Sequence, residues 1–120
     1  MKYMLLIYDN EQVWAQMSAA EQGRLFGEYM KFTEEIKASG HYIAGAPLQP
    51  VATATSVRIR NDKQLMTDGP FAETQEQLGG YYLVEARDLN EAIGIAGRIP
   101  SVRVGTIEVR PIMEMGEAAG

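Results

Sequence analysis

Two short segments that are apolar on both faces constrain the fold of this chain more than any other feature. Segments 2–8 and 80–86 carry apolar side chains at odd and at even positions alike. Successive side chains of a β-strand point to opposite faces of the sheet, so both faces of such strands have to be covered. The segment 2–8 is therefore predicted to be a central strand covered on both sides, and 80–86 to be a strand with apolar residues on both faces.

Two helices are predicted from cap signals and apolar periodicity. Ser18 and Glu21 have the spacing of a capping box, and the helix that they start runs to Ser39. Its apolar stripe consists of Leu25, Tyr29, Phe32 and Ile36. Asp88 and Glu91 form a second cap pattern. The helix that follows is predicted to bury Leu89, Ala92, Ile93, Ala96 and Ile99.

Shorter strands complete the pattern, at 41–47, 54–60, 64–67 and 106–111. The connection after the first strand is read as a loop that carries Trp14, the single tryptophan. The resulting order is β-α-β-β-β-α-β. It predicts an α+β, ferredoxin-like sandwich with both helices on one sheet face, as a single domain over 1–113 with a C-terminal tail at 114–120. The other sheet face has no helix to cover it, so we expect a homodimer formed sheet to sheet.

The hairpin between the strands at 54–60 and 64–67 has two alternative registers. A two-residue loop of Asn61 and Asp62 places Met66 beside Val57, whereas a three-residue loop that includes Lys63 places Thr67 there. The second register also pairs Leu65 with Ile59. We predict the second, because it puts more apolar bulk on the buried face.

The densest local chemistry lies at 66–82, and Asp68 is its leading residue. Gly69 and Pro70 end the strand directly after it. A carboxylate at a strand end serves as a general base if burial raises its pKa. The alternative is structural: the carboxylate caps the amides of a following turn that has Pro70 at its first helical position. Asp68 is the candidate catalytic residue, and the candidate ligand-binding residues, in a pocket between sheet and helices, are Tyr8, Glu73, Tyr81 and Tyr82.

Composition excludes several classes of function. The net charge of −5 argues against a nucleic-acid partner, and a chain with no cysteine and one histidine, His41, is predicted to bind no metal and no cofactor. Glu73 and Glu76, three residues apart on a predicted helical turn, are read as a solvated acidic face. The apolar run at 4–7 is too short to span a membrane. We expect a cytoplasmic protein without a membrane partner.

Several segments together resemble one known family. The Asp-Gly-Pro-Phe tetrad within 67–74 is followed by Gly79-Gly80 and two tyrosines, and segments 1–8, 88–96 and 108–111 match as well. The chain thus resembles the DGPF family of the YCII-related proteins. The resemblance implies the dimeric α/β-barrel variant of the ferredoxin-like fold. Some relatives carry a His-Asp pair proposed to be catalytic, but Tyr29 stands where that histidine is sought, and Gln75 where members often have lysine.

Two functional hypotheses follow. In the first, the chain is a small-molecule-binding or enzymatic dimer with a pocket near the turn at Asp68. In the second, it is a non-catalytic interaction or regulatory protein, because the resemblance implies a genetic association with extracytoplasmic-function sigma factors. A pocket lined by Asp68 and buried tyrosines would favour the first hypothesis.

Overall fold

The computed structural model describes residues 1–115 and has a four-stranded antiparallel sheet at its centre, in the order β2-β5-β1-β6. The strands of this sheet are β1 (Lys2–Asp9), β2 (Tyr42–Pro47), β5 (Gln77–Glu85) and β6 (Thr106–Pro111). The strand predicted to be central, β1, pairs with β5 in the middle of the sheet. The predicted ferredoxin-like α+β fold is confirmed.

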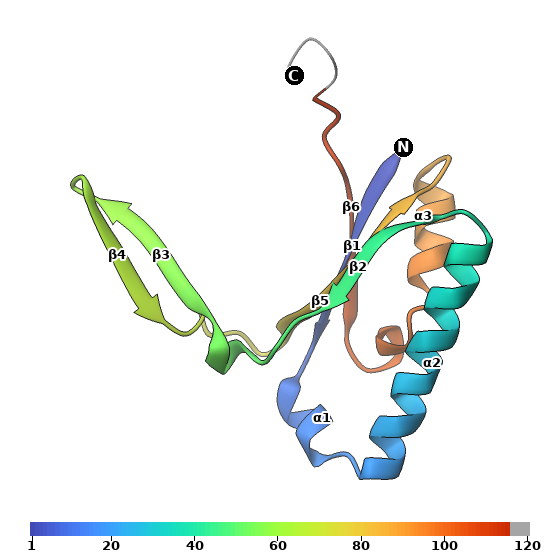
Figure 1. The fold of residues 1–120 in the computed structure, drawn as a ribbon, viewed down its shortest axis with the longest axis horizontal. Helices are drawn as coiled ribbons and strands as arrows, with labels where there is room; N and C mark the ends of the chain where they lie inside the picture. Colours follow the sequence, from blue (N-terminus) through green and yellow to red (C-terminus); the bar gives the residue numbers. More distant parts are fainter. Residues whose placement is uncertain (116–120) are drawn as a thin grey trace.

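The helices α2 (Ala19–Ala38) and α3 (Leu89–Ala96) lie on the same face of this sheet (Figure 1). Both predicted caps are formed. The Ser18 hydroxyl accepts a hydrogen bond from the Glu21 amide at 3.1 Å, and the Asp88 carboxylate accepts one from the Glu91 amide at 2.9 Å. A short 3₁₀ helix, η2 (Pro100–Arg103), then leads from α3 towards β6.

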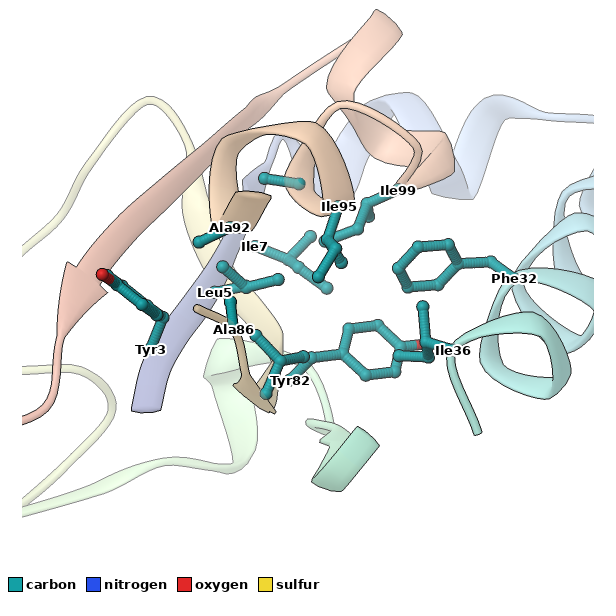
Figure 2. Packing of buried hydrophobic residues seen from close by; sticks show 12 residues of the cluster. Tyr3, Leu5, Ile7, Phe32, Ile36, Tyr82, Ala86, Ala92, Ile95 and Ile99 are labelled. Carbon is teal, nitrogen blue, oxygen red and sulfur yellow. The ribbon is translucent and has the colours of Figure 1, made fainter. Parts of the chain in front are cut away.

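The hydrophobic core fills the space between the sheet and these helices (Figure 2). Its largest fully buried apolar side chains are Tyr3, Leu5, Ile36, Val84 and Ile99. Phe32 meets the ring of Tyr82 edge to face at 5.2 Å between ring centroids. Each fully buried side chain of this size contributes about 1.5–3 kcal/mol of hydrophobic free energy. This core therefore fixes α2 and α3 on one face.

The face of α3 that enters the core differs from the predicted one. Leu89 and Ile93 are exposed, whereas Ile95 is buried with Ala92, Ala96 and Ile99. Positions i, i+3, i+4 and i+7 lie on one side of a helix, and the set that begins at Ala92 packs on the sheet. The prediction that Leu89 and Ile93 belong to the core was therefore wrong.

Trp14 lies in a helix where a loop was predicted. Asn10 caps the short α1 (Glu11–Gln16), and its side-chain oxygen accepts a hydrogen bond from the Gln12 amide at 2.9 Å. None of the six residues of α1 is buried. A helix of this length has no detectable apolar period, so its capping residue is the only sequence signal.

The face of the sheet opposite α2 and α3 carries none of the helices of residues 1–115 (Figure 1). Half-buried apolar side chains lie on it, among them Met4, Leu6 and Leu83. Met4 pairs with Leu83 across β1 and β5. We call this surface the open sheet face.

The strands β3 (Thr55–Arg60) and β4 (Lys63–Asp68) form a separate two-stranded sheet, which we call the arm. The arm projects from the sheet on the side opposite α2 and α3 (Figure 1). Every side chain of β3 and β4 except that of Ser56 is exposed. At the base of the arm the Gly69 amide donates a hydrogen bond to the Ala54 carbonyl at 2.6 Å.

The register of the arm corrects the predicted one. Val57 pairs with Met66, and the loop consists of Asn61 and Asp62, with φ of +52° and +62°. A two-residue loop with positive φ at both positions matches the twist of a hairpin, and Asn and Asp tolerate this conformation. The prediction of a three-residue loop was wrong because it assumed that one face of the hairpin is buried, whereas both faces of the arm are exposed.

The structure describes only part of the predicted C-terminal tail. Strand β6 ends at Pro111, and residues 116–120 of the predicted tail at 114–120 lie outside the described residues. The single domain over 1–113 stays a prediction. No helix within residues 1–115 has the length and apolar character needed to cross a membrane.

Candidate functional site

Three polar side chains from three elements meet at the end of β1. Asp9, the last residue of that strand, accepts a hydrogen bond through Oδ2 from the Ser101 hydroxyl at 3.3 Å. Ser101, in η2, in turn accepts one from the Tyr29 hydroxyl of α2 at 2.5 Å. Ser101 is only 2 % exposed and is the one buried polar side chain among the described residues. The three groups therefore form a directional chain that ends on the Asp9 carboxylate, and we call it the Asp9 relay.

Two glycines allow the backbone to close around Asp9. The pairing of β1 with β5 shifts after Ile7, so Gly79 is an extra residue beside the carboxylate. A Cβ at Gly79 would lie 3.4 Å from Asp9 Oδ1, and a Cβ at Gly105 would overlap the Tyr8 carbonyl oxygen. β-Bulges of this kind commonly re-aim a side chain beside a functional site. Gly80, in contrast, packs against β2, since a Cβ there would lie 3.0 Å from the Ala46 carbonyl oxygen.

Burial sets the electrostatics of the relay. It raises the pKa of Asp9, and the nearby carboxylates of Glu11 and Glu76 act in the same direction, while the hydrogen bond from Ser101 opposes them. Burial also raises the pKa of Tyr29, so its hydroxyl stays protonated as a donor to Ser101. A carboxyl group with a raised pKa is a better proton acceptor near neutral pH than an ordinary one. The relay therefore has the character of a general-base site.

A small pocket opens directly beside Asp9. Its lining residues are Asp9, Asn10, Val13, Trp14, Met17, Leu25 and Val104. The cavity volume is about 20 Å³, which is room for about one water molecule. Ligand pockets usually have volumes of roughly 300–1,000 Å³, so a molecule of one ring enters this pocket only if one of its walls moves outward. One wall is α1, which buries none of its own residues and can therefore move at little cost.

Asp68, the residue predicted to be catalytic, lies in the arm. It is the last residue of β4 and is exposed. Its side chain makes no hydrogen bond within residues 1–115, and no helix follows Pro70, so the predicted cap is not formed. Glu73 is exposed in the connection 69–76, where no helical turn places it beside Glu76. The catalytic role of Asp68 stays a prediction.

The three tyrosines predicted to bind a ligand lie on opposite faces of the sheet. Tyr8 and Tyr81 are half-buried on the open sheet face, and burial together with the Glu108 carboxylate raises the pKa of Tyr8. Tyr82 belongs to the core, where its hydroxyl lies 2.6 Å from the Thr33 hydroxyl and burial raises its pKa. Side chains on opposite faces cannot line one pocket, so the structure does not bring the predicted site residues together.

The residues of the relay carry only weak signals in the amino-acid sequence. Asp9 is the first acidic residue after an apolar strand, and this position could have singled it out. Tyr29 was assigned to the apolar stripe of its helix, and Ser101 carries no local signal. Tyr29 and Ser101 are 72 residues apart, and Ser101 and Asp9 are 92 apart. Within residues 1–115, no group of three or more His, Asp or Glu side chains could hold a metal ion.

A solved structure supports the fold. The chain is similar to 5-chloro-2-hydroxyhydroquinone dehydrochlorinase (TftG) from Burkholderia phenoliruptrix AC1100, solved in complex with 2,5-dihydroxybenzoquinone. The TM-score is 0.57 over 95 % of each chain, with 15 % sequence identity. At that identity the similarity establishes a shared ferredoxin-like fold.

Sequence comparison establishes the family. An uncharacterized protein of Rhizobium meliloti (strain 1021) is 32 % identical over 114 residues, which cover 93 % of this chain and 92 % of the relative. The family model of the YCII-related domain matches residues 1–116. The predicted resemblance is confirmed, and the chain belongs to the YCII-related family.

Proposed function

We propose that α1 moves outward to admit a small, largely apolar molecule to the pocket beside Asp9, and that Asp9 acts on this molecule as a proton acceptor. The observation that carries this proposal is the half-buried carboxylate of Asp9, with raised pKa, at the wall of a pocket otherwise lined mainly by apolar side chains. A ligand with an acidic hydroxyl or C–H group facing Asp9 would complete the site. This location replaces the turn at Asp68 as the proposed centre of the function.

The relay gives each residue a distinct task. Asp9 takes the proton, and Ser101 holds the carboxylate in place by donating to Oδ2. Tyr29 fixes the Ser101 hydroxyl by donating to it, which leaves the Ser101 proton free to point at Asp9. Trp14 and Leu25 offer apolar surface to the body of the ligand. The ligand of the structural neighbour, 2,5-dihydroxybenzoquinone, is a single ring and indicates the size of a first probe. A simple phenol of that size carries the hydroxyl proton that Asp9 would accept.

Trp14 provides the readout for a binding test, because it is the single tryptophan and lies in the pocket wall. Titration with simple phenols is expected to quench Trp14 fluorescence in a saturable way. Asp9→Asn should weaken the binding at least tenfold. Asp68→Asn is the matched control and should leave it unchanged. Native mass spectrometry of freshly purified protein tests independently for a bound molecule.

Two outcomes of this test would contradict the proposal. One is the absence of saturable quenching with every probe, together with no bound molecule in native mass spectrometry. The other is binding that Asp9→Asn leaves intact and Asp68→Asn removes, which would return the site to the arm.

We further propose that the protein works as a homodimer formed through the open sheet face. Leu6 pairs with Tyr81, and Met4 pairs with Leu83, so apolar side chains cover the middle of that face. Such side chains favour burial against another layer, and a second copy supplies a self-complementary one. Light scattering at micromolar concentration should give twice the 13.3 kDa mass of the chain. A monomer that binds no hydrophobic dye would overturn this part of the proposal.

A further inference from the structure

The arm has one apolar and one basic face. Directly paired residues of a hairpin share a face, and alternate residues along a strand point the same way. Val57, Ile59 and Met66 therefore lie together on one face, with exposed fractions of 57 %, 64 % and 68 %. The reverse face carries the basic side chains Arg58, Arg60 and Lys63. The two-residue loop is responsible, because the alternative register would have placed Met66 on the basic face.

An exposed apolar ribbon of this kind needs a partner. A two-stranded hairpin on its own is at best marginally stable in water. Within residues 1–115 the arm pairs with no further strand, and its apolar side chains are not covered by the rest of the chain. An exposed apolar patch of this kind marks an interaction site.

Charge and position both identify that molecule as a second copy of this chain. The arm, residues 55–68, holds three basic and two acidic residues, and the remaining eight basic and fourteen acidic residues give the rest of the chain a charge of −6. Two copies thus attract each other when the arm of one approaches the body of the other. The arm also projects on the side of the open sheet face (Figure 1), so a copy docked on that face would lie next to it.

We propose that the arm clasps the second copy of the chain, with Val57, Ile59 and Met66 packed against the body of that copy. A two-fold axis would make the contact twice, so each arm would hold the other protomer. This inference rests on the homodimer proposed above and adds to it: the arms, and not only the open sheet faces, hold the dimer together.

The test compares two neighbouring residues of β4 that face opposite sides. Met66→Asp places a charge on the apolar face, and Leu65→Asp places the same charge on the basic face. Sedimentation equilibrium of the full chain should show a dimer dissociation constant at least tenfold higher for Met66→Asp than for Leu65→Asp. A variant without residues 55–68 should have a dimer dissociation constant at least as high as that of Met66→Asp. The contact between Ala54 and Gly69 allows the two ends in this variant to be joined by a short glycine linker.

A second measurement does not depend on weakening the dimer. Because the chain has no cysteine, Met66→Cys and Leu65→Cys each provide a single position for a nitroxide label. The label at 66 should lose mobility as the protein concentration rises through the dimer dissociation constant, and the label at 65 should stay mobile.

The possible outcomes separate the two proposals. A full chain that is monomeric in light scattering overturns the homodimer and, with it, the clasp. A dimer whose dissociation constant is the same in wild type, Met66→Asp and the armless variant overturns the clasp alone. Equal mobility of the labels at positions 65 and 66 in the dimer also overturns the clasp alone.

Discussion

Asp9 and Asp68 occupy equivalent positions in two strands but have different surroundings. Each is the last residue of its strand, β1 for Asp9 and β4 for Asp68. Asp9 is enclosed by η2, α2 and the bulge at Gly79, and burial raises its pKa. Asp68 is exposed in a ribbon that belongs to no larger sheet. A carboxylate at the end of a strand becomes a candidate for chemistry only when elements distant in sequence close around it.

The largest difference in stability between the two strand ends is expected when the glycine beside each of them is replaced by alanine. A Cβ at Gly105 would overlap the Tyr8 carbonyl oxygen next to Asp9, so Gly105→Ala requires a backbone shift and should cost about 3 kcal/mol. Gly69, after Asp68, has open space around it and a φ of +93°, so Gly69→Ala should cost only about 1 kcal/mol of strain. Urea unfolding of both variants measures the difference. Equal losses would mean that the end of β1 is no more tightly packed than the base of the arm.

The serine beside each carboxylate gives a smaller contrast. Ser101→Ala leaves the Tyr29 hydroxyl and the Asp9 carboxylate without a buried partner, so it should cost about 2 kcal/mol. Ser56, near Asp68, is half-buried and donates to the Gly69 carbonyl at 2.9 Å, and Ser56→Ala should cost about 0.5–1 kcal/mol. Thermal unfolding of the two variants tests the order. A loss at Ser56 that matches or exceeds the loss at Ser101 would argue against a tightly held relay.

The smallest expected effect on stability comes from the carboxylate charges of Asp9 and Asp68, and it depends on pH. Because the pKa of Asp9 is raised in the folded state, the folded chain holds that proton more tightly than the unfolded chain. Stability is therefore lost as pH rises from the unfolded value of about 3.9 through the raised folded pKa, and the whole penalty is present above that folded pKa. Asp9→Asn removes the penalty and should raise the melting temperature at pH 7 by at most a few degrees.

The melting temperatures of the wild type and Asp9→Asn at low pH check this explanation. The gain from Asp9→Asn should disappear below about pH 4, where the wild-type carboxyl is protonated in both states. Asp68→Asn changes an exposed side chain and should alter the free energy of unfolding at pH 7 by less than about 0.5 kcal/mol. A gain from Asp9→Asn that persists at pH 3 would have to come from packing and not from the charge.

Features with a local cause could be predicted from the sequence. The cap at Ser18 and the cap at Asp88 each depend on residues within one helical turn, and both are formed. The two-faced apolar pattern of β1 and β5 reflects their central position in the sheet. From these signals the order of the main elements and the fold class follow.

Features that depend on distant contacts could not be predicted. The Asp9 relay joins residues of β1, α2 and η2, and nothing near Ser101 in the sequence indicates its burial. The predicted register of the arm was wrong because an apolar alternation does not by itself indicate a buried face. Val57 and Ile59 alternate with polar residues, yet both are exposed in the single chain. Turn chemistry at Asn61 and Asp62 was the better guide to the register.

The contact between Ala54 and Gly69 at the base of the arm also has a consequence for folding kinetics. The 29 residues 48–76 connect β2 to β5, and the arm, residues 55–68, makes up nearly half of them. A hairpin closes within about 1–10 μs, well before strands distant in sequence pair. Once closed, it leaves 15 residues as the effective loop between β2 and β5, and a twofold shortening lowers the entropic cost of closure by about 0.6 kcal/mol. We therefore expect Asn61→Val, which disfavours the tight turn, to slow refolding of the sheet in stopped-flow experiments about threefold, and an unchanged rate would show that β2 and β5 pair before the hairpin closes.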